Sequence, residues 1–165
     1  MDVRKWLQFI KPNLKFYKNG FFEFPFLANT PELMIKATIE TPGSKHNINE
    51  QKVYRNNPFI KGTLQYRKIE EGLWLTITNL EFKQNTLIRT AYDKNIPSEH
   101  YTLTFTLYES QVKLQNTFIG KIPFQNKFWG FKKPGTDIGA HFYKGSKCEF
   151  YIFHFKPDWI KKIFL

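Results

Sequence analysis

Residues 70–82 alternate between two kinds of side chain, and this alternation restricts the fold more than any other stretch of the chain. A period of two, carried by β-branched and aromatic residues, predicts a β-strand. The two alternating sets are Leu73, Leu75 and Ile77 on one face and Trp74, Thr76 and Thr78 on the other. Because both faces carry sizeable groups, we expect this strand in the wall of a closed or two-layered β structure, with no catalytic residue on it.

The remainder of the chain repeats this pattern in short segments separated by turn residues. Further strands are predicted over residues 62–69, 87–92, 101–108, 112–119, 127–131, 138–143 and 148–155. Regular short strands of this kind are typical of a β-sandwich or barrel. Aromatic residues, which favour strands, make up 18% of the 165 residues, and a chain of this length is expected to form one domain with its own core.

The N-terminal third contains one strong local signal and one weak one. Asn19 and Gly20 stand between aromatic runs and predict a β-hairpin over residues 15–24, because both positions of a type I′ turn need positive φ. Residues 1–12 predict a short amphipathic helix that ends at Pro12.

Residues 30–57 are harder to assign. Thr30 followed by Pro31 is typical of a helix start, but the apolar residues of segment 30–42 alternate as in a strand, and we favour the strand. Residues 44–57 are rich in Asn and Lys and predict a polar loop, which we expect to be the most mobile part of the chain.

The C-terminal residues 156–165 predict a helix. Pro157 and Asp158 suit its first turn, because proline has a helical φ and the carboxylate opposes the helix dipole. Four apolar residues follow at helical spacing: Trp159, Ile160, Ile163 and Phe164. Since the helix stops after about two turns on apolar residues, we expect the chain to be one domain of a longer protein. The alternative is a short terminal helix that docks on the β structure.

The net charge and the cysteine content limit which partners and which cellular compartment fit the sequence. The net charge of +11 suits a polyanionic partner, or else lysines scattered over solvent-facing strand edges, and we favour the second reading because the lysines do not cluster. Cys148 stands alone, so no internal disulfide can form. With no signal peptide and no apolar run of membrane-spanning length, the sequence favours a cytoplasmic location.

No catalytic motif is found. The four histidines lack the spacing of metal ligands, and Cys148 has no partner at a distance typical of a nucleophile. Phosphate-binding loops and the Gly-x-Ser-x-Gly motif are absent from the sequence. The sequence therefore predicts a protein that is not an enzyme, with no catalytic residue, no metal ligand and no cofactor.

Aromatic and polar residues on different predicted strands suggest a binding pocket instead. If the strands close into a barrel, some of these side chains must point inward. A barrel opening lined with aromatic and polar groups is a common small-molecule site. The candidate pocket residues are Trp74, Thr76, Thr78, Phe105, Trp129, His141 and Tyr143. Core packing is the alternative role for each aromatic residue.

Several motifs, taken in order, carry a resemblance to a known family. They are Gly62-Thr63-Leu64, then Glu71-Gly72-Leu73-Trp74-Leu75, the strand of residues 102–107, and Phe155-Lys156-Pro157-Asp158-Trp159-Ile160. From about residue 58 to residue 165 the chain resembles the N-terminal regulatory domain of AraC/XylS-type bacterial transcription regulators.

The resemblance implies a fold, a function and a domain order. It implies a mainly β, cupin-like double-stranded β-helix or jelly-roll barrel over residues 58–156, which binds an unidentified small-molecule effector. Residues 1–57 would be an extension with the β-hairpin, and residues 157–165 would begin a linker or dimerisation helix with Trp159, Ile160, Ile163 and Phe164. The partners would be a second copy in a homodimer, no membrane, and DNA only through a helix-turn-helix domain absent from this chain. The alternatives are a cupin-fold metal-dependent enzyme and a ligand-free dimerisation module.

Overall fold

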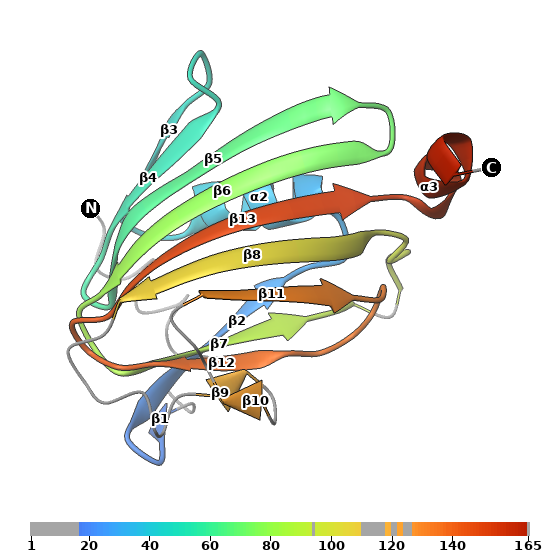
Figure 1. The fold of residues 1–165 in the computed structure, drawn as a ribbon. Helices are drawn as coiled ribbons and strands as arrows, with labels where there is room; N and C mark the ends of the chain where they lie inside the picture. The colour runs from blue at the N-terminus through green and yellow to red at the C-terminus, as the bar shows by residue number, and fades with distance from the viewer. Residues whose placement is uncertain (1–16, 94, 110–117, 120–121, 124–126, 165) are drawn as a thin grey trace.

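The computed structural model describes residues 17–93, 95–109, 118–119, 122–123 and 127–164 (Figure 1). Its described strands form two sheets, with the helix α2 (Pro31–Glu40) beside them and the helix α3 (Pro157–Phe164) at one end. The prediction of a mainly β fold with a C-terminal helix is confirmed. The strands of the described residues belong to two separate sheets and do not close into one barrel.

In the described part of the chain the larger sheet has seven antiparallel strands, and it includes the alternating stretch of residues 70–82. Their order is β11 (Lys127–Lys132), β8 (Tyr101–Glu109), β13 (Lys147–Phe155), β6 (Leu73–Phe82), β5 (Ile60–Glu70), β4 (Lys52–Asn56) and β3 (Ser44–Asn47). Directly opposite residues on neighbouring strands share a face, so Thr76 lies in one row with Ile152 and Thr104. Because alternate residues of a strand face the same side, this row and every second row on either side of it form the inner face of the sheet.

The smaller sheet contains the predicted hairpin. Its order is β1 (Tyr17–Lys18), β2 (Phe21–Leu27), β7 (Thr86–Ala91), β12 (Gly139–Phe142), β9 (Phe118–Ile119) and β10 (Ile122–Pro123). Asn19 and Gly20 have φ values of 52° and 83°, as a two-residue type I′ turn requires. Strands β2 and β7 pair in parallel. The predicted helix over 1–12 and most of the predicted strand over 112–119 lie outside the described residues.

The prediction of a strand within residues 30–42 is wrong, because this segment forms α2. Thr30 caps the helix by accepting a hydrogen bond from the Leu33 N–H at 3.2 Å, and Pro31 occupies the first turn. The buried residues Pro31, Met34, Ile35 and Thr38 follow the helical spacing i, i+3, i+4, i+7. The alternating apolar residues misled the prediction, since the cap and the helical stripe decide the structure.

The prediction of a loop over residues 44–57 is also wrong, because the segment forms the hairpin of β3 and β4. Its turn is built from polar groups: the Asn47 carbonyl oxygen Oδ1 accepts from the backbone N–H of Asn49 and Glu50, and Gln51 has a φ of 51°. Val53 is the fully buried residue of β4. The hairpin is polar in sequence because it lies at the sheet edge with much of its surface in water.

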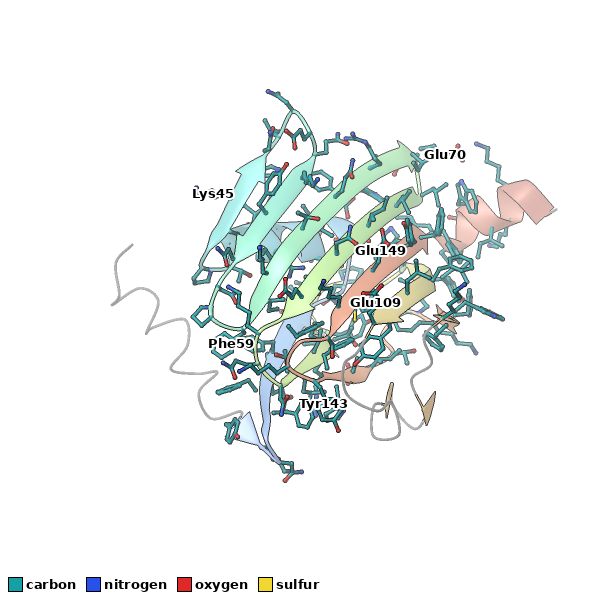
Figure 2. The ribbon with its side chains drawn as sticks, turned by 60° about the vertical axis from the view of Figure 1, so that its left-hand side comes forward. Lys45, Phe59, Glu70, Glu109, Tyr143 and Glu149 are labelled. Atoms are coloured by element: carbon teal, nitrogen blue, oxygen red, sulfur yellow. The ribbon has the colours of Figure 1, made fainter. Side chains whose placement is uncertain are left out.

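Helix α3 is attached to the turn between β5 and β6. The Trp159 Nε1–H donates to the Glu70 carboxylate at 2.6 Å, and the Lys156 N–H donates to the Gly72 carbonyl at 2.9 Å. Figure 2 shows Glu70 at the end of the molecule where α3 lies. The C-terminal helix therefore contacts the loop that begins β6.

The core joins the two sheets. Phe82 of β6 stacks on Phe142 of β12, with ring centroids 4.3 Å apart and an interplanar angle of 3°. A second cluster of Ile35, Val53 and Leu64 holds α2 against the larger sheet. Cys148 is buried in the cluster that contains Phe82 and Phe142, and burial raises the pKa of its thiol, so the thiol stays protonated.

Candidate functional site

A pocket of about 1150 Å³ lies between the inner face of the larger sheet, the smaller sheet and α2. We call it the interlayer pocket. Among the residues that line it are Leu27, Met34, Arg55, Thr104, Phe128 and Ile152. Binding pockets for small molecules commonly occupy about 300–1,000 Å³, so this one has room for a sizeable ligand.

The walls of the interlayer pocket are mainly apolar, with a few hydroxyl groups. The smaller sheet supplies side chains such as Phe24, Leu27 and Ile88. On β8, three threonines at every second position point to the same side, and all three line the pocket: Thr102, Thr104 and Thr106. A surface of this kind suits an apolar ligand body with few polar groups.

Arg55 brings a positive charge into this wall. Desolvation lowers the pKa of its guanidinium to about 10, which leaves it protonated at neutral pH. Its buried Nε–H has no acceptor among the described residues.

Two histidines line the interlayer pocket at the end of the larger sheet that lies away from Arg55. His154 Nε2 is 3.1 Å from Thr76 Oγ1, and both side chains are buried. Desolvation, with smaller contributions from the charges of His100 and Lys132, lowers the pKa of His154 to about 3. Desolvation also lowers the pKa of His100, whose buried Nδ1 has no partner among the described groups. Both histidines are therefore neutral at pH 7.

Lys132 is the second basic residue in the wall. Its Nζ donates to the Tyr92 hydroxyl at 2.7 Å. Desolvation lowers the pKa of Lys132 to about 8, while the charge of Asp137 acts in the opposite direction. Lys132 thus already has a hydrogen-bond partner in the protein.

The structure places the predicted pocket residues in several different environments. Thr78 lines the interlayer pocket, and Trp129 borders it at β11 with 66% of its side chain exposed. Thr76 is buried and bonded to His154. Trp74 shares the inner face but packs against the cluster beneath α2.

The other three predicted residues do not line the interlayer pocket. Phe105 lies on the outer face of the larger sheet, 45% exposed. His141 and Tyr143 both pack against Phe21, with ring centroids 4.9 and 5.3 Å away. Figure 2 shows Tyr143 at the end of the molecule opposite Glu70.

The residues predicted for a linker helix do lie on α3. Trp159 packs on Phe155, with ring centroids 6.1 Å apart, and Ile160 is half-buried. Ile163 and Phe164 belong to α3, and their side chains lie outside the described part of the structure.

Sequence reasoning missed the basic groups of the pocket. Arg55 fell in a segment interpreted as a loop, although its spacing of two from Val53 carries the strand signal that would have placed both on one face. His154 is one of the four histidines that lack the spacing of metal ligands, and nothing in the pattern of residues 148–155 indicates a pocket.

The outer face of the larger sheet carries a second notable surface. Four large apolar side chains of β8 and β11 are exposed there: Phe105, Leu107, Trp129 and Phe131, at 45%, 44%, 66% and 53%. Trp129 and Phe131 lie on the edge strand β11 and also border the interlayer pocket. We call this set the outer apolar patch. Exposed apolar residues scattered singly are normal, whereas a contiguous group marks an interaction surface.

The described residues contain neither a cluster of metal-ligand side chains nor a membrane-spanning helix. No three His, Cys, Asp or Glu side chains of this part gather where they could hold a metal ion. In the same part, no helix combines the length and the apolar character needed to cross a membrane. Comparisons with protein-family models, with curated proteins and with solved structures find no match to the chain.

Proposed function

We propose that the protein binds an apolar small molecule in the interlayer pocket and serves as a ligand-sensing domain. The observation that carries this proposal is the pocket itself, at about 1150 Å³ and with mainly apolar walls. Pockets with such walls and a few placed polar groups are the usual form of small-molecule sites.

The resemblance to AraC-type regulators supplies the proposed purpose of this binding. In this scheme a cupin-like arrangement of the two sheets holds an effector and controls a helix-turn-helix domain in the bacterial cytoplasm. The connection to α3 supports it, because His154 in the pocket wall precedes the first residue of that helix, Pro157, by only three positions. A ligand that contacts β13 could then bias the position of the helix through its differential affinity for two states.

The pocket can be tested with the neutral fluorescent probe N-phenyl-1-naphthylamine. We expect wild-type protein to bind it with enhanced, blue-shifted emission. Thr104→Trp places a large ring in the pocket and is expected to weaken binding at least about tenfold, equivalent to roughly 1.4 kcal/mol. Fluorescence titration measures both dissociation constants.

Phe105→Trp is the matched control, because it adds the same indole on the opposite face of the same strand. It is expected to leave binding unchanged, and circular dichroism verifies that both variants are folded. If Thr104→Trp does not fold, Thr78→Phe at another position in the pocket wall replaces it. Equal probe binding by the pocket variant and the control would refute ligand binding in the interlayer pocket.

A dimerisation module is the second candidate, and the outer apolar patch is the observation that favours it. Strands β8 and β13 also carry charges of both signs on this face, including Lys147 opposite Glu109, as a self-complementary surface requires. Figure 2 shows Glu109 and Glu149 on these neighbouring strands.

We expect Trp129→Lys to shift the protein from dimer to monomer in sedimentation equilibrium, because it places a charge among the apolar side chains of a buried interface. Lys45→Ala, on the exposed edge strand β3, is the control and should leave the mass unchanged. A wild-type protein that stays monomeric at high micromolar concentration would exclude this candidate. The described residues offer no observation for the third candidate, a metal-dependent enzyme.

A further inference from the structure

Arg55 points into the interlayer pocket because of its place on β4. Val53, two residues earlier, is fully buried, and alternate residues of a strand face the same side. The residue opposite Arg55 on β5 is Gly62, which has no side chain. Its partner on β3 is Ser44, whose hydroxyl donates to the Thr38 carbonyl at 2.9 Å. Neither neighbouring strand therefore provides a group of opposite charge.

The charge of Arg55 has no carboxylate partner among the described residues. None of the ion pairs found there includes Arg55, and desolvation alone accounts for its lowered pKa of about 10. Glu40 is the only carboxylate of the described pocket wall, and it does not contribute to that shift. Arg55 is half-buried and largely desolvated in this wall, and a charge held there without a partner is unfavourable, so the position favours an anionic group as its partner.

Lys132, the second basic residue in the wall, lies far from Arg55. In the register of the larger sheet, Arg55 belongs to the row of Leu80, whereas Lys132 belongs to the row of Trp74. Six residues along β6 separate these rows by roughly 20 Å, at about 3.3 Å per residue. The hydrogen bond of Lys132 to Tyr92 and its lowered pKa leave Arg55 as the stronger anion-binding group.

Between these two rows the pocket wall contains no charged side chain from the central strands. The inner-face residues there are apolar or threonine, among them Leu64, Thr78, Phe150 and Ile152. One ligand could therefore place an acidic group at Arg55 and extend an apolar body along this wall.

We infer that the interlayer pocket takes an amphiphilic anion, and that the Arg55 guanidinium binds its acidic group. The inference rests on the proposed binding function and adds to it the chemical class of the ligand. A carboxylate, sulfonate or phosphate group suits Arg55, because guanidinium donates two parallel hydrogen bonds to such anions.

Two probes with the same aromatic skeleton test this inference. 8-Anilinonaphthalene-1-sulfonate carries a sulfonate that N-phenyl-1-naphthylamine lacks. We expect wild-type protein to bind the sulfonate more tightly than the neutral probe. Arg55→Met should weaken sulfonate binding at least about tenfold and change binding of the neutral probe less than about twofold, since the methionine keeps an apolar stem but loses the charge. Arg55→Lys should bind the sulfonate with an affinity between those of the wild type and Arg55→Met, because lysine keeps the charge without the paired donors.

The outcomes separate this inference from the proposed function. Equal binding of the two probes, with neither affected by Arg55→Met, overturns the anion inference and leaves ligand binding intact. Failure of both probes to bind overturns the proposed function. Thr104→Trp must weaken both probes, which confirms that they occupy the interlayer pocket rather than the outer apolar patch. If Arg55→Met does not fold, Arg55→Gln provides the uncharged variant.

Discussion

Replacing Phe82 with alanine is expected to lower the free energy of unfolding by about 3–5 kcal/mol. Phe82 is fully buried and stacks on Phe142, which is 1% exposed, so this pair connects the larger sheet to the smaller one. The change removes the transfer free energy of the ring and leaves a cavity between β6 and β12. Urea denaturation at pH 7.5, followed by tryptophan fluorescence, measures the loss.

Phe105→Ala is the matched control, because Phe105 is the same residue type on the outer face of the same sheet, 45% exposed. It should cost only roughly 1 kcal/mol, since nearly half of Phe105 stays exposed in the folded protein. Similar losses for the two variants would mean that the contact between the sheets is not the main core of the protein.

Lowering the pH from 7.5 to 5 is expected to destabilise the wild-type protein more than a His154→Gln variant, by about 2 kcal/mol. The pKa of His154 is about 3 in the folded protein, against 6.5 in an ordinary environment. Between these values the unfolded chain binds a proton that the folded chain does not, so stability falls with pH. The loss begins near pH 6.5 and continues down to about pH 3.

Urea denaturation at several pH values measures this difference. The glutamine of His154→Gln can still bond to Thr76, so the variant should remain folded at neutral pH. His46→Gln is the control, because His46 is exposed and bonded to the Tyr66 hydroxyl, and it should keep the wild-type pH dependence. An identical pH dependence in all three proteins would contradict a buried neutral imidazole at position 154.

Local sequence signals predicted most of the strands, because their information lies in adjacent residues. The turn at Asn19 and Gly20 needs only two residues with positive φ, and the alternation of β6 needs only its own side chains. The two wrong predictions have a common cause. In α2 and in the hairpin of β3 and β4, a single capping or turn group outweighs the overall pattern of the segment.

The candidate site was harder to predict, because it depends on how the layers meet. Alternation placed Trp74, Thr76 and Thr78 on one face, yet only Thr78 lines the interlayer pocket. α2 contributes to the cluster over Trp74, and that helix had been expected to be a strand. Arg55 is distinguished by having no carboxylate partner in the described part of the chain, and this can be judged only once the neighbouring strands are in position.

The parallel pairing of β2 with β7 has a consequence for the order in which the protein folds. Asn29, just after β2, bonds to the backbone of Asp93, just after β7, at a sequence separation of 64 residues. Strands β3, β4 and β5 each pair with the next strand along the chain, so their loops are short and close quickly. During synthesis β2 leaves the ribosome before these strands but must wait for β7, and until then its partner among the described strands is the two-residue strand β1.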